Sequence, residues 1–143
     1  LLELHYSFLV EARSHLNPGG AAICSIGGRF PIEFSREMVE SLGYECKEDM
    51  AGYKVQTELG DVLRGFNKTE GGKNADFYRH EESIRFLENK LGMKPPYIGL
   101  TGQDLKDVLS RFRISGEEAY RISQNDNNFV VGHTVHMMRA INQ

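Results

Sequence analysis

The stretch HLNPGGAAICSIGGRF, from His15 to Phe30, decides the fold that the sequence predicts. It begins at the end of an amphipathic helix, which Pro18 cannot continue. The two glycines after Pro18 permit the positive φ of a tight reversal. The apolar run over 21–26 then predicts a strand buried on both faces, as in a parallel sheet covered by helices.

Helices are predicted on both sides of this strand. Over residues 1–16 one helical face carries Leu2, Tyr6, Leu9 and Leu16. Downstream, Pro31 suits the first turn of a second helix, and Gly43 suits its C-terminal cap. A helix, a turn, a buried strand and a helix make up half a turn of an α/β sandwich, so we expect an α/β fold.

The rest of the chain predicts further short elements. We expect a strand over 44–50, then a second strand or an extended linker over 51–57. A helix capped by Thr57 and a strand over 75–80 complete a first region, 1–80.

The second region, 81–143, is predicted to be a mostly helical extension that ends in a strand. Its elements are a helix ending at Gly92, an extended connector, two helices capped by Thr101 and Ser115, and a β-rich segment over 129–141 with Gly132 as a candidate bulge.

Composition indicates a globular protein and excludes some functions. The chain has 143 residues, of which 40% are hydrophobic and 26% charged, enough for one domain with a sizeable core. A net charge of −3 argues against a broad nucleic-acid surface. No apolar run approaches the roughly 20 residues that span a bilayer, and no signal peptide is visible. Cys24 and Cys46 are predicted to be reduced thiols, which favours the cytoplasm.

The first residues, LLELHYSFLVEARSHL, are already in helical register and carry no Met. This indicates a fragment whose partner half lies upstream. We expect that missing N-terminal half of the same protein to be its main partner.

The helix that ends in L-x-PGG before an apolar strand resembles the turn between the fourth helix and the fifth strand of class I S-adenosylmethionine-dependent methyltransferases. The segments IGGRF, LGYE, KVQTELGDVL and DFYRH are similar to the methyltransferase domain of the methionine S-methyltransferase type. The resemblance covers residues 1–80 and implies the C-terminal half of a Rossmann-like sheet.

The same resemblance implies S-adenosylmethionine as the cofactor of the full-length protein. The family's Gly-rich loop, its acidic residue after the second strand and its Asn/Asp-Pro-Pro-Tyr/Phe motif do not occur in this sequence. We therefore expect a fragment that is inactive alone, that lacks most of the cofactor site and that contributes acceptor-side structure. The implied acceptor is a small molecule or a protein.

Gly27, Gly28, Arg29 and Phe30 follow the buried strand, at the sheet end where α/β proteins bind ligands. In one interpretation the glycines let a substrate approach the backbone while Arg29 binds its carboxylate or phosphate. In the other they only turn the chain, and Arg29 pairs with a neighbouring acid. Tyr78 is a candidate wall of the acceptor pocket or, alternatively, a core aromatic.

Other patterns carry weaker predictions. His133 and His136 would share a face on a helix but not on a strand, and their β-branched neighbours favour a strand without metal. Residues 101–123 superficially resemble a helix-turn-helix, but the connection is long and the charges balance.

Two alternatives to a methyltransferase fragment stay open: a non-catalytic partner-binding domain on a half-Rossmann scaffold, and a nucleic-acid-binding module. A homodimer could form through the surface that the missing half would cover.

Overall fold

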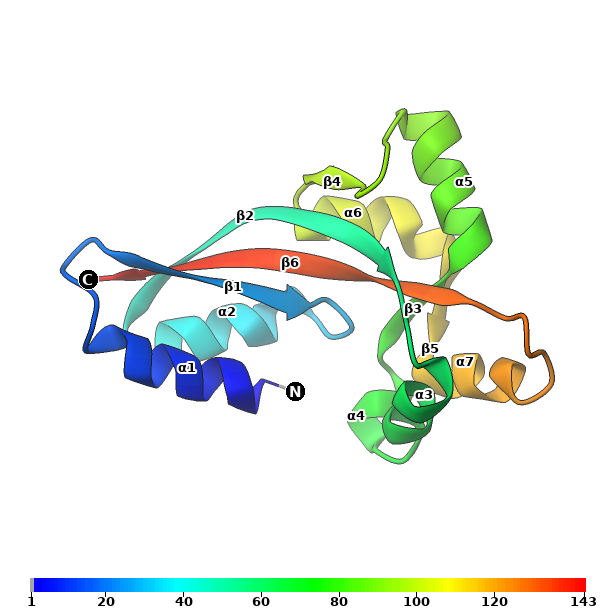
Figure 1. Cartoon of the computed structure of the whole chain (residues 1–143), viewed down its shortest axis with the longest axis horizontal. Coiled ribbons are helices and arrows are strands. Elements are labelled where there is room, and N and C mark those ends of the chain that lie inside the picture. Colours follow the sequence, from blue (N-terminus) through cyan, green and yellow to red (C-terminus); the bar gives the residue numbers. More distant parts are fainter. Residues whose placement is uncertain (1) are drawn as a thin grey trace.

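A computed structural model describes residues 2–143 and shows a mixed α/β fold around one six-stranded sheet (Figure 1). Its central strand is β6 (Val131–Asn142), which pairs along its length with β2 (Tyr44–Val55). The other edge of β6 is shared, because β1 (Ala21–Gly27) pairs with residues 135–141 and β3 (Asp76–Arg79) with 131–132. All these pairs are antiparallel.

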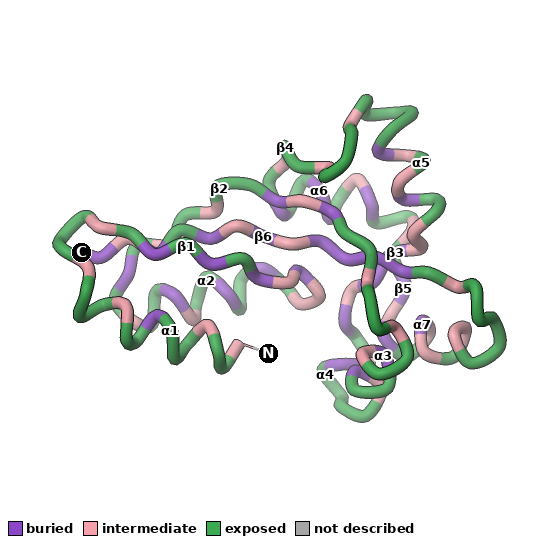
Figure 2. Tube along the Cα trace, viewed as in Figure 1, coloured by how far each residue is buried: buried purple, intermediate pink, exposed green. Residues whose placement is uncertain are grey.

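Two helices cover one face of the sheet around β1. They are α1 (Glu3–Arg13) and α2 (Ile32–Ser41), and they enclose a core with alternate residues of β1 and β6. The other face of β1 is open, since buried and exposed residues alternate along the strand (Figure 2). The exposed fraction of Ile23 is 61%. The prediction that this strand is buried on both faces is therefore wrong for the described chain, because helices pack against one face only.

The sheet around α2 keeps one feature of a parallel architecture. Since β1 and β2 are both antiparallel to β6, which lies between them, they run parallel to each other. The helix α2 connects them as a crossover. In the described part of the chain β1 pairs with β6 alone, so its outer edge carries no strand.

The remaining helices form two further cores around β3. One core lies between α3 (Leu59–Asn67), α4 (Glu70–Lys73), α7 (Gly116–Ser123) and Phe77. The other lies between α5 (His80–Leu91), α6 (Gly102–Leu109), the 3-10 helix η1 (Ser110–Phe112) and Tyr78. Phe77 and Tyr78 thus point to opposite faces of the sheet, because successive side chains alternate along a strand. The small strands β4 (Ile98–Leu100) and β5 (Arg113–Ser115) complete the sheet.

Several local predictions are confirmed. Thr101 and Ser115 cap α6 and α7, accepting from the amides of Asp104 and Glu118 at 3.2 and 3.1 Å. Gly43 and Gly92 end their helices, with φ of +79° and +63°. Residues 131–142 form a single strand.

Other local predictions need correction. The two segments expected over 44–57 form one continuous strand, β2, because β6 pairs with it throughout. Thr57 does not cap α3, since Glu58 occupies the cap position in a left-handed conformation. In the pairing of β2 with β6 the register shifts between Glu48 and Met50 and not at Gly132. At Gly132 a side chain would collide with Tyr53, which explains the glycine.

The sheet contains strands from both sides of the predicted boundary at residue 80. The strand β6 belongs to the second predicted region, yet it joins β1 and β2 of the first. The second region therefore completes the sheet of the first. Among the described residues no helix has both the length and the apolar character needed to cross a membrane.

Candidate functional site

The loop from Gly27 to Phe30 follows β1 and lies where β1, β3 and β6 meet. The amide of Gly28 donates to the Thr134 carbonyl at 2.7 Å, and the Thr134 hydroxyl reaches the Gly28 carbonyl at 3.3 Å. The central strand therefore fixes the loop directly.

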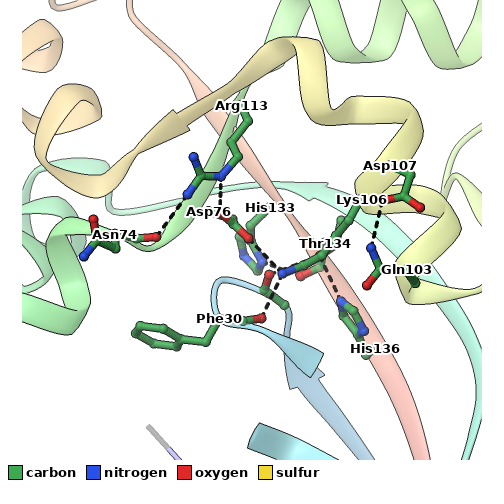
Figure 3. A network of polar contacts seen from close by, with 11 residues as sticks. Phe30, Asn74, Asp76, Gln103, Lys106, Asp107, Arg113, His133, Thr134 and His136 are labelled. Atoms are coloured by element: carbon green, nitrogen blue, oxygen red, sulfur yellow. Dashed lines mark hydrogen bonds and ion pairs between the residues drawn. The ribbon is translucent and has the colours of Figure 1, made fainter. Parts of the chain in front are cut away.

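A buried cation holds the far end of the same loop (Figure 3). The ammonium of Lys106 donates to the Phe30 carbonyl at 2.8 Å and to Asp76 Oδ2 at 2.9 Å. Arg113 Nε contacts the other carboxylate oxygen of Asp76. The single carboxylate of Asp76 thus serves two cations, and the amide of the same residue donates to the Arg29 carbonyl at 2.7 Å.

The guanidinium of Arg29 is held by neutral groups. Its Nη1 lies 2.9 Å from His133 Nε2 and 3.2 Å from Gln56 Oε1. Its Cζ lies 5.3 Å from the centroid of the Phe66 ring, in cation–π range. A Cβ on Gly27 would lie 3.3 Å from Cζ, Nη1 and Nη2 alike, so the missing side chain lets the guanidinium lie flat against the backbone.

The tautomer of His133 follows from its contacts. Its Nδ1 lies 2.9 Å from the Thr134 carbonyl, which can only accept, so Nδ1 carries the proton and Nε2 accepts from Arg29. Burial, helped by the charge of Arg29, lowers the pKa of His133 to about 4. His133 is therefore neutral near pH 7. In the described part of the chain no carboxylate forms an ion pair with Arg29, so the predicted acid partner is not found.

A second histidine lies beneath the loop, wedged between two glycines. His136 Nε2 lies 3.0 Å from the Thr134 hydroxyl, and Cβ atoms on Gly28 or Gly102 would overlap the imidazole. His136 Nδ1 lies 3.3 Å from Glu48 Oε1 without forming a hydrogen bond. Burial lowers the pKa of His136 to about 4 and raises that of Glu48.

The structure brings four of the five predicted site residues together and separates the fifth. Gly27, Gly28, Arg29 and Phe30 form the loop, but Tyr78 lies in the hydrophobic core with 1% of its surface exposed. Tyr78 packs with residues of α5 and α6, and burial raises its pKa. It therefore has no exposed surface with which to line a pocket.

Sequence patterns did not reveal the partners of Arg29. Gln56 follows β2, Phe66 lies in α3 and His133 lies in β6, and no spacing motif links them.

His133 and His136 lie three apart on a strand, which sends them to opposite faces as predicted. Within residues 2–143 no group of three potential metal ligands occurs. The segments α6 and α7 are separated by η1 and β5, so they do not form a helix-turn-helix.

Two cavities are lined in part by Arg29 and Phe30, and a third lies away from the loop on the sheet. One, of about 550 Å³, is largely apolar and is lined by Arg29, Phe30, Asp61, Val62, Gly65, Phe66 and Thr69. The second, of only about 30 Å³, has His5 and Phe34 among its lining residues. The third, of about 290 Å³, is lined by residues of β1, β2, β4 and β6, among them Ser25, Met50, Ile98 and Met137. The first places an apolar space beside a guanidinium, which suits a ligand with an anionic end.

Comparison with models of known protein families and with curated proteins finds no match. The relationship that the sequence predicts therefore stays a prediction, and the site is interpreted from its own geometry.

Alanine at Gly28 or Gly102 should destabilise the fold. The new Cβ would overlap the buried imidazole of His136 in either variant, and overpacking costs about 1–3 kcal/mol or more. The matched control is Gly65→Ala in α3, where the Cβ meets nothing within 4 Å and where alanine should stabilise by about 0.5–1 kcal/mol. Urea unfolding measures all three, and equal stability of Gly28→Ala and wild type would contradict the packing described.

Lowering the pH from 7 to 5 should reduce the free energy of unfolding. The folded-state pKa of His136, about 4, lies below the usual value, so the unfolded chain binds more protons as the pH falls below about 6.5. The loss from His136 at pH 5 is roughly 2 kcal/mol, and His133, whose pKa is also lowered to about 4, adds a similar loss. The raised pKa of Glu48 offsets part of the total.

Urea unfolding at both pH values tests this expectation. His136→Gln should show a smaller loss than wild type, whereas the same change at exposed His15 should leave the loss as it is. An unchanged loss in His136→Gln would mean that another group carries the pH dependence.

Proposed function

We propose that this chain is the C-terminal, acceptor-binding part of an S-adenosylmethionine-dependent methyltransferase with a Rossmann-like sheet. The observation that carries the proposal is the end of β1. There a crossover strand with an unpaired outer edge leads into a loop that carries the guanidinium of Arg29 beside an apolar cavity. In open α/β sheets this end of the strands is where ligands bind.

The arrangement of β1, α2 and β2 supports a continuing sheet. These elements form a parallel crossover with antiparallel β6 between the strands, and mixed sheets of this kind are common in doubly wound folds. Further parallel strands would add to the outer edge of β1.

Exposed apolar side chains lie where such an addition would bury them. On α1, Leu4 and Phe8 are 79% and 48% exposed, and on the open sheet face Ile23 and Met50 are 61% and 42% exposed. Strands added at β1 and helices placed on the open face would cover these side chains, because both faces of parallel sheets are covered in α/β proteins. The exposed positions thus support the proposal that an N-terminal half of the same protein packs here.

The residues present do not make a site for S-adenosylmethionine. The amide of Gly28 is already bonded to Thr134, and Gly28 faces His136, so the glycine pair cannot cradle a ligand as a Gly-rich loop does. The neighbouring guanidinium of Arg29 would repel a sulfonium cation. In our proposal the added strands therefore hold the cofactor, and this chain holds the acceptor.

The proposed role suits the chemistry of methyl transfer. The cofactor supplies an activated methyl group, so the protein mainly has to align the acceptor with it. A loop anchored by β6, β3 and α6 is rigid enough to orient a bound acceptor. Arg29 would supply the contact that fixes the acceptor's orientation.

The unpaired edge of β1 also favours a second candidate function. A non-catalytic domain could use the same edge, together with Ile23, to bind a partner strand by β-augmentation. Binding of S-adenosylmethionine by the product of the complete gene distinguishes the two candidates, because only the methyltransferase needs it.

The proposal predicts that the complete gene product transfers radiolabelled methyl groups from S-adenosylmethionine, whereas the chain 1–143 alone does not bind this cofactor. The gene upstream of Leu1 should encode a strand followed by a Gly-rich loop. Calorimetry on the chain and a methyl-transfer assay on the gene product are the measurements. A gene that encodes no such segment, or a gene product without affinity for the cofactor, would contradict the proposal and favour the partner-binding domain.

A further inference from the structure

We propose that Arg29 binds the carboxylate of a small ligand whose apolar body occupies the cavity between Phe30 and α3. As a statement about the methyl acceptor this rests on the proposed function above. As a statement about binding it rests on the donors, the charges and the cavity alone.

The guanidinium of Arg29 has one edge in use and one edge free. Both of its hydrogen bonds, to His133 and Gln56, come from Nη1, while Nε and Nη2 donate to nothing within residues 2–143. His136 Nδ1 is the only described side-chain polar atom that is fully buried without a partner, so the free donors of Arg29 are accessible to solvent. Nε and Nη2 form the side-on fork that binds a carboxylate with two parallel hydrogen bonds.

The groups that contact Arg29 do not compensate its charge, and Asp61, which lines the same cavity, forms an ion pair with Arg64 at 3.6 Å instead. His133 presents a lone pair and Gln56 a carbonyl oxygen, and both are neutral. The aromatic ring of Phe66 attracts the cation but carries no charge either. A half-buried cation without a counter-ion is costly, and an incoming carboxylate would remove that cost.

The walls of the cavity indicate which kind of carboxylate would bind. It has a volume of about 550 Å³, and Phe30, Val62 and Phe66 give it apolar walls, with the two rings 5.8 Å apart. An aryl or alkyl group would bury apolar surface there while its carboxylate reaches Arg29.

A single negative charge fits this site better than a phosphate dianion. Lys106 and Arg113 do not line this cavity, so Arg29 is the only cation among its lining residues. Asp61 also lines the cavity, and its carboxylate would repel a dianion. The geometry therefore favours a monocarboxylate over a phosphate ester.

The test is calorimetric titration of the chain with phenylacetate, with its neutral amide and with inorganic phosphate, without S-adenosylmethionine. Phenylacetate should bind saturably, and the amide and phosphate at least 10-fold more weakly. Arg29→Gln should weaken phenylacetate binding about 10- to 100-fold, as expected for charge-assisted hydrogen bonds. Arg29→Lys keeps the charge but not the two parallel donors, so its affinity for phenylacetate should lie between that of the wild type and that of Arg29→Gln.

The matched control is Arg111→Gln, because Arg111 also stacks on an aromatic ring, with its Cζ 4.6 Å from the centroid of Phe86, but lies outside this cavity. It should bind phenylacetate as wild type does. If Arg29→Gln does not fold, an NMR titration of the wild type with phenylacetate takes its place. The ¹⁵N–¹H resonance of Arg29 Nε should then shift as phenylacetate is added.

Three results would each overturn the inference: equal affinity for the amide, tighter binding of phosphate, or an undiminished affinity in Arg29→Gln. Its failure is distinguishable from failure of the proposed function. Methyl transfer by the gene product only to acceptors without a carboxylate would contradict this inference as a statement about the methyl acceptor and leave the proposed function intact. Carboxylate binding by the chain without any methyl transfer by the gene product would contradict only the proposed methyltransferase function.

Discussion

The pairing of β6 with three other strands is the constraint on which the rest of this structure depends. Its one edge is filled by β2, and its other edge is divided between β1 and β3. The division brings the end of β1 next to the start of β3, and the Gly27–Phe30 loop lies at that junction. Without β6, neither the loop nor the partners of Arg29 would have fixed positions.

Electrostatics then sets what the junction can bind. Two cations, Lys106 and Arg113, share Asp76 and lock the loop, whereas Arg29 faces only neutral partners. Burial keeps His133 neutral near pH 7, so it supports the guanidinium without adding charge. The result is a rigid positive group at the mouth of an apolar cavity. Such a combination suits orientation of an anionic ligand, which is the task that an acceptor site has in methyl transfer.

Local sequence signals predicted the helix ends and the position of the loop, because Pro18, Gly43, Gly92 and the caps act over a few residues. They could not predict the sheet, since the contact between Arg29 and His133 joins residues 104 positions apart. They also misjudged β1, whose apolar sequence is typical of a strand covered on both faces although helices cover one. Its composition matches the sheet that we propose for the complete protein, whereas its burial in the structure is that of this chain alone. Tyr78 was ambiguous for a similar reason: an aromatic on a short strand serves equally as core or as pocket wall.

The measurement that tests the central claim most directly is amide hydrogen exchange in β1, in this chain and in the complete gene product. In an antiparallel pair, alternate amides of β1 face away from β6. Our account predicts that these outward amides exchange rapidly in the chain alone and become protected in the complete protein, because a further strand pairs with them. Equal, rapid exchange in both would show that β1 is a true sheet edge, and the sheet would then not continue into an N-terminal half.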